Sequence, residues 1–162
     1  MRILGIDPGI GRCGWAIVSI QKSVVSSQGY GCIETSAKQN VADRLKAIHD
    51  EISKIIKKYS PDTLSIEELF FNTNAKTAFV VGQARGVALL CASLNNLEVA
   101  IYTPLQVKMA LTGYGRADKN QIGQMVKVLL KLEAIPKPDD ASDALAVALT
   151  HAFSEKTSRL YK

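Results

Sequence analysis

Hydrophobic residues near the start of the chain fall into short, nearly continuous runs. Ile3 to Ile6 is a short apolar run, which is typical of a strand buried on both faces. Two β-rich runs follow at 13–20 and 23–33, and Gln21 with Lys22 lies between them as the turn of a hairpin. Together these runs predict a three-stranded antiparallel meander.

Longer stretches with helical spacing follow and alternate with two more strands. The predicted elements are a helix over 41–59, a strand over 62–67, a helix over 76–94, a strand over 99–102, and helices over 105–111, 118–131 and 140–152. Asn40 is placed to cap the first helix, and Asp118 with Gln121 has the spacing of a capping box. The order βββαβαβα with extra helices predicts one α/β domain over residues 1–162, with a mixed five-stranded sheet flanked by helices.

Composition and charge are those of a basic globular protein. Of 162 residues, 47% are hydrophobic, and the net charge is +5, which suits a polyanionic partner but is also ordinary for a soluble protein. Cys13, Cys32 and Cys91 show no metal-binding spacing, and no signal-peptide pattern is present, so we expect a reduced, cytoplasmic protein. The most apolar stretch, 78–94, contains polar residues and therefore predicts a buried helix rather than a membrane span.

Acidic residues stand at comparable places in the predicted elements. Asp7 ends the first strand and Glu67 ends the fourth, while Asp140 and Asp143 share one face at the start of the last helix. If strands one and four are neighbours and the alanine-rich helix packs on the sheet, the four carboxylates converge. Converging carboxylates repel unless cations neutralise them, and two Mg²⁺ ions supply the matching charge. The pattern predicts a two-metal site that cleaves a phosphodiester.

Each acid also has a structural explanation. Asp7-Pro8-Gly9 is a common turn sequence, and Asp140 can cap a helix. Glu67 and the adjacent Glu68 can be solvated at a strand end. Only convergence of the acids distinguishes the two interpretations.

Two other classes of protein share parts of this pattern. Actin-like and sugar-kinase ATPases have an Asp-x-Gly turn after a first strand, but they bind ATP between two domains and need a longer chain. A non-catalytic DNA-binding module on the same scaffold gains nothing from four acids that face DNA. Binding of ATP would identify the first class, and junction binding without metal-dependent nicking would identify the second.

Basic residues follow the predicted fifth strand. Residues 99–131 contain Lys108, Arg116, Lys119, Lys127 and Lys131, with Asp118 as the only acid. A positive rim lets a polyanion approach an acidic pocket, and we expect Lys108, Arg116 and Lys119 to contact DNA. Lys127 and Lys131 are equally well explained as a solvated helix face. Phe70 and Phe71 can stack on an unpaired base, although core packing explains at least one of them equally well.

Four segments together resemble the bacterial RuvC family of Holliday-junction resolvases. They are GIDPG at 5–9, IEELF at 66–70, GQARGV at 82–87 and DASDALA at 140–146. The resemblance covers essentially the whole chain in length and motif order. It implies an RNase H-like fold and a homodimer that nicks two opposed strands of a four-way DNA junction in recombination and repair, with Mg²⁺ or Mn²⁺. A branch-migration helicase complex of the RuvA and RuvB type is the implied partner.

The resemblance also implies a set of metal-binding, catalytic carboxylates. The positions that match are Asp7, Glu67, Asp140 and Asp143. Glu68 occupies a position where the family does not need an acid. We expect cleavage to leave 5′-phosphate ends, because water attacks in line and the 3′-oxygen leaves.

Further positions match residues with other roles in the family. Lys108 and Lys119 match basic residues that serve catalysis near the scissile phosphate. Phe70 matches an aromatic residue that acts on junction bases. Gly82 and Gly86 lie four residues apart in the helix that forms the family's dimer interface, and we expect close backbone packing there.

Overall fold

The predicted meander and the two later strands join into one mixed sheet in the order β3-β2-β1-β4-β5. The computed structural model describes residues 1–22, 24–69 and 75–160. The strands are β1 (Arg2–Asp7), β2 (Arg12–Gln21), β3 (Val24–Glu34), β4 (Thr63–Glu67) and β5 (Glu98–Tyr102). The first three pair antiparallel, whereas β1 with β4 and β4 with β5 pair parallel. The predicted hairpin and sheet are therefore confirmed.

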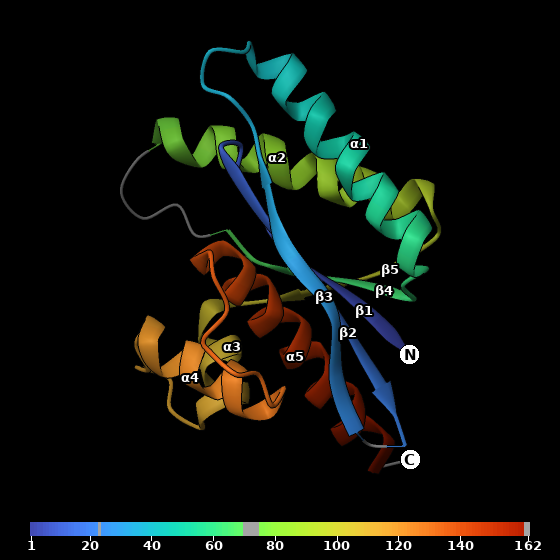
Figure 1. The fold of residues 1–162 in the computed structure, drawn as a ribbon, viewed down its shortest axis with the longest axis vertical. Coiled ribbons are helices and arrows are strands. Elements are labelled where there is room, and N and C mark those ends of the chain that lie inside the picture. The colour runs from blue at the N-terminus through green and yellow to red at the C-terminus, as the bar shows by residue number, and fades with distance from the viewer. Residues whose placement is uncertain (23, 70–74, 161–162) are drawn as a thin grey trace.

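Helices cover both faces of this sheet (Figure 1). They are α1 (Val41–Tyr59), α2 (Ala75–Leu94), α3 (Pro104–Thr112), α4 (Lys119–Leu129) and α5 (Asp139–Leu160). One core layer joins the sheet to α1 and α2, and the other joins it to α5, α3 and α4. In the central strand β1, Ile3 faces the second of these layers, while Leu4 and Ile6 face the first. All three are fully buried, as expected for a strand covered on both faces.

Local side-chain signals account for most helix ends. Asn40 caps α1 by accepting the backbone N–H of Asp43, and Ser60 ends the helix in the left-handed region. The capping box of Asp118 and Gln121 is confirmed at the start of α4. That helix ends at Leu129, before the predicted residue 131, where the chain turns to a positive φ.

The last helix is longer than the prediction. It begins at Asp139 and continues past Ala152 to Leu160. The alanine-rich pattern ends near Ala152, but the next residues include Glu155 and Lys156, which favour helix without an apolar pattern. Periodicity alone therefore underestimated its length.

The helix α2 differs most from expectation. It is not buried on all sides, because Phe79, Leu90 and Leu94 are 68%, 53% and 64% exposed. Within the single chain nothing packs closely on its glycines: a Cβ at Gly86 would meet nothing within 4 Å, and one at Gly82 would meet only Leu69, at 4.0 Å. The close packing expected at a dimer interface on this helix stays a prediction. None of the described helices is long and apolar enough to cross a membrane.

Candidate active site

The first two acids of the predicted set end neighbouring strands. Parallel pairing of β1 with β4 places Ile6 opposite Ile66, so Asp7 and Glu67 follow at the same edge of the sheet. Both carboxylates lie at the carboxyl ends of their strands, where an α/β sheet commonly forms a site. The structure therefore brings Asp7 and Glu67 side by side, as the sequence predicted.

The other two acids arrive on the first two turns of α5, which lies directly on the sheet. A Cβ at Gly5 would collide with the carbonyl oxygen of Ala144, and a Cβ at Gly14 would collide with that of Asp140. Gly14 pairs with Asp7 across β1 and β2. The two glycines thus allow the helix to approach closely, and this approach places the start of α5 beside Asp7.

The four carboxylates lie near enough to one another to influence the pKa of Asp7. Burial raises the pKa of the Asp7 carboxyl to about 7, and the negative charges of Asp143 and Asp140 add to the rise. Glu67 raises the pKa of Asp7 further, while Lys119 opposes the rise. The pKa of Glu67 is itself raised, first by burial and then by Asp143. Such a cluster favours any cation that can enter it.

Two side-chain cations already bind this cluster. The Nζ atom of Lys119 lies 2.8 Å from Oδ2 of Asp143, and this hydrogen bond raises the pKa of Lys119. The Nε atom of Arg12 lies 3.5 Å from Oδ2 of Asp140. Neither Asp7 nor Glu67 has an ion pair with any residue that the structure describes.

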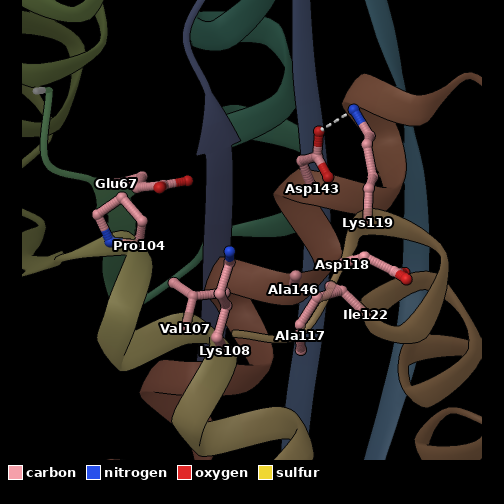
Figure 2. Close-up of a pocket in the computed structure, with 10 residues that line it drawn as sticks. All are labelled: Glu67, Pro104, Val107, Lys108, Ala117, Asp118, Lys119, Ile122, Asp143 and Ala146. Atoms are coloured by element: carbon pink, nitrogen blue, oxygen red, sulfur yellow. Dashed lines mark ion pairs between the residues drawn. The ribbon is translucent and has the colours of Figure 1, made fainter. Parts of the chain in front are cut away.

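A pocket of about 250 Å³ opens between these groups (Figure 2). Figure 2 shows Glu67 on one side and Asp143 with Lys119 on the other, while Lys108 points into the space between them. The Lys108 charge lowers the pKa of Glu67, against the larger effect of burial. The rest of the pocket lining is largely apolar and includes Val107, Ala117, Ile122 and Ala146. The pocket therefore combines carboxylates, the ammonium groups of Lys108 and Lys119, and an apolar wall.

The donor chemistry fits a hard divalent cation. All four candidate ligands are carboxylates, which Mg²⁺ and Mn²⁺ prefer. As the side chains stand, no group of three Asp, Glu, His or Cys residues in the described part of the chain is arranged to hold a metal ion. Lys119 on Asp143 and Arg12 on Asp140 occupy two of the four carboxylates. Burial raises the pKa of Asp7, and three neighbouring carboxylates add to the rise, so a cation at this place would stabilise the charged form of Asp7.

Other predicted site residues lie outside this pocket. Arg116 is exposed on the loop between α3 and α4, and Glu68 is exposed just beyond β4. Gly82 and Gly86 lie on α2, on the opposite face of the sheet from α5. Phe70 and Phe71, the residues predicted to stack on an unpaired base, lie outside the described residues.

Sequence reasoning assigned no role to Arg12. It starts β2, and its guanidinium bridges Glu34 of the neighbouring strand and Asp140 of the last helix, at 3.5 Å from each. The available signal was a cation placed two residues before Gly14, the position on which α5 packs.

The sequence of this chain is similar to those of DNA-processing enzymes. The family model described as "Crossover junction endodeoxyribonuclease RuvC" matches residues 3–151. A protein of that same description from Alkaliphilus oremlandii is 52% identical over 162 residues, which are 100% of this chain and 99% of the relative.

Solved structures agree with the sequence comparison. A structure of Thermus thermophilus RuvC in complex with Holliday junction substrate is 34% identical, with a TM-score of 0.93, and the match covers 98% of this chain and 96% of that one. The yeast mitochondrial Holliday junction resolvase Ydc2 shares the fold, with a TM-score of 0.72 at 12% identity over 99% of this chain and 81% of that one.

Proposed function

The chain belongs to the RuvC family of crossover junction endodeoxyribonucleases and resolves Holliday junctions in recombination and repair, and we propose that it does so by metal-dependent hydrolysis at Asp7, Glu67, Asp140 and Asp143. The observation that carries this proposal is the convergence of the four carboxylates around half-buried Asp7. The whole chain acts as one RNase H-like nuclease domain over residues 1–162.

The metal is Mg²⁺, two ions per site, and Mn²⁺ substitutes for it. Four carboxylate charges are balanced by two divalent cations, which is why the cluster tolerates so many acids in one place. When bound, the ions supply the charge that stabilises the attacking and leaving oxygens of the phosphodiester. Asp143 would hold a metal ion in exchange for the ammonium group of Lys119, to which it is joined at 2.8 Å.

The basic residues hold the scissile phosphate over the carboxylates. Lys108 points into the pocket and Lys119 lies at its rim, which supports a role for both ammonium groups as hydrogen-bond donors to phosphate oxygens. Arg116 extends the positive rim along the loop. In-line attack by water then releases the 3′-oxygen and leaves a 5′-phosphate. Phe70 stacks on an unpaired base at the junction.

Two copies of the chain act together as a two-fold dimer. A four-way junction offers two equivalent strands, so symmetric cutting needs two sites related by a dyad. The face of α2 that carries Gly82 and Gly86 also exposes Phe79 and Leu90, and nothing in the described part of the chain covers it. Two glycines on this face let a second helix approach closely. A branch-migration complex of the RuvA and RuvB type delivers the junction.

Cutting of an end-labelled four-way junction tests the proposal. Wild-type protein is incubated with the junction in Mg²⁺ and in excess EDTA, and the ends are mapped by ligation, which requires a 5′-phosphate. We expect paired nicks in opposed strands with Mg²⁺ and intact junction in EDTA. Equal cutting in EDTA would overturn the metal mechanism, and products that cannot be ligated would overturn the assignment of the leaving oxygen.

A further inference from the structure

A second hollow lies beside the candidate active site, between the end of α3 and the start of α4. Its volume is about 350 Å³, and its lining includes Tyr114, Ala117, Asn120, Gln121, Gln124 and Met125. Ala117 lines both this hollow and the active-site pocket, and residues of α4 line each of them, so the two spaces are neighbours. We call it the amide hollow.

The lining of the amide hollow combines an aromatic ring with free amides. Tyr114 is 55% exposed. Within the described part of the chain, no hydrogen bond involves the side-chain amides of Asn120 and Gln124. Gln121 uses its carbonyl oxygen to accept the N–H of Asp118, which leaves its NH₂ group available. Aromatic rings stack on nucleobases, and amides form hydrogen bonds with base edges.

The loop that presents Tyr114 is held firmly. The hydroxyl oxygen of Thr112 accepts the backbone N–H of Tyr114 at 3.0 Å, and the carbonyl oxygen of Tyr114 accepts the N–H of Ala117 at 3.1 Å. A Cβ at Gly115 would press on Leu105, so the loop lies tightly against α3. Binding at Tyr114 therefore does not have to order the backbone that carries it.

The surroundings favour DNA as the occupant. Residues 105–131 carry five basic side chains and one acid, which complements a phosphate backbone. Arg116 is exposed on the same loop, Lys108 lies on the helix before it, and Lys119 lies on the helix after it. A strand that reaches the carboxylates past Lys108 and Lys119 passes close to the amide hollow, because Ala117 lines both spaces.

We infer that the amide hollow binds one unstacked nucleobase of the junction, close to the scissile phosphate, with Tyr114 stacked on the base and the amides of Asn120 and Gln124 at its edge. This inference rests on the proposed function, because it requires the cut strand to lie at the carboxylate cluster. It assigns a base-reading role to a surface that is separate from the metal ligands.

Photo-crosslinking and binding test the inference. Junctions that carry 5-iodo-deoxyuridine at successive positions are bound in EDTA, irradiated, and mapped by mass spectrometry. We expect one position near the exchange point to crosslink to Tyr114. Replacement Y114A should weaken junction binding by about five- to a hundredfold, whereas Y114F, which keeps the ring, should stay within about twofold of wild type.

Further variants distinguish stacking of the Tyr114 ring from the effect of side-chain size and from hydrogen bonding to the base edge. Y114L keeps an apolar side chain but loses the ring, and it should behave like Y114A. Q124A should change the dependence of cutting on the base at the crosslinked position. Y30A removes a partly exposed tyrosine from β3, at the other edge of the sheet, and should leave binding unchanged. Thermal unfolding of each variant shows that it is folded.

Several results would overturn the inference and leave the proposed function intact. The first is a junction affinity of Y114A and Y114L equal to that of wild-type protein. The second is the absence of any crosslink to the loop 113–118 while wild-type protein still cuts the junction. The third is a Y114A variant that loses binding to a partner protein and keeps its binding to DNA. If wild-type protein neither binds nor cuts the junction in Mg²⁺, the proposed function fails first.

Discussion

Replacing Asp7 by asparagine keeps the size of the side chain but removes one charge from the carboxylate cluster. In metal-free protein, burial and three neighbouring acids raise the pKa of Asp7 to about 7, from 3.8 in the unfolded chain. The folded state therefore binds more protons than the unfolded state between these values. Stability contributed by this group is present below about pH 4 and is lost as the pH rises to about 7.

The pKa difference sets the size of the effect. About three pH units correspond to about 4 kcal/mol at pH 8, which is the upper bound on what Asp7→Asn can restore. We expect roughly 2 kcal/mol, because the new amide must find its own hydrogen bonds in a half-buried place. For a chain of this length, this corresponds to a rise in Tm of about 4–8 °C. At pH 4 the rise should vanish, since Asp7 is then protonated in the folded state.

Urea unfolding in EDTA at pH 8 and pH 4 measures this difference, and Asp139→Asn is the matched control. Asp139 also lies in the first turn of α5, but it is exposed, and its hydrogen bond with Lys137 lowers its pKa. The same charge change there should not raise stability. Cutting by Asp7→Asn in Mg²⁺ should fall by several orders of magnitude, because a metal ligand that stabilises the transition state is lost.

The opposite pattern would refute the reasoning. If Asp7 only forms the turn with Pro8 and Gly9, Asp7→Asn should be less stable at pH 8, and its cutting should fall only in proportion to the folded fraction. A variant that melts early yet cuts normally at low temperature would exclude Asp7 from the metal site.

Three further predictions follow from the same geometry. Glu67→Gln should abolish cutting while exposed Glu68→Gln changes it little, and equal losses in a gel assay would contradict the distinction between the two acids. Lys119→Met should lower cutting but increase the affinity of the DNA-free protein for Mn²⁺, because Lys119 competes with the metal ion for Asp143. Calorimetry measures this affinity, and unchanged or weaker Mn²⁺ binding would show that no competition exists. Leu90→Asp on α2 should convert a dimer to monomer in light scattering, whereas Val24→Asp, at a similarly exposed apolar position, should not; a wild-type monomer, both free and on DNA, would rule out the dimer.

Elements with local signals were predictable from sequence. The bounds of α1 follow from its apolar spacing, the Asn40 cap and the stop at Ser60, all of which act within a few residues. The ends of α4 and α5 were less predictable because the apolar pattern stops before, or continues beyond, the helical backbone. The open face of α2 could not be read from its composition, which is that of a buried helix; only the resemblance, through the dimer interface that it implies on this helix, pointed to it.

In the candidate site, too, some features have local sequence signals and others depend on tertiary packing. The places of Asp7, Glu67, Asp140 and Asp143 in their elements can be read from the sequence, because each stands at the end of a strand or at the start of a helix. Which cations meet these acids cannot be read in this way. Arg12 reaches Asp140 from a residue 128 positions earlier, and Lys119 reaches Asp143 from another helix. These pairings depend on tertiary distances that no local pattern encodes.

The packing of α5 joins the stability of the fold to the geometry of the site. Gly5 and Gly14 have no side chain, so the backbone at Ala144 and Asp140 can rest on β1 and β2. The same helix turn carries Asp143, and Ala141, Ala144 and Ala148 are fully buried against the sheet. A larger residue at Gly14 would have to displace the start of α5 and move Asp140 away from Asp7. The carboxylate cluster therefore requires small residues at these positions. They set the distance between α5, which carries Asp140 and Asp143, and the strands that carry Asp7 and Glu67.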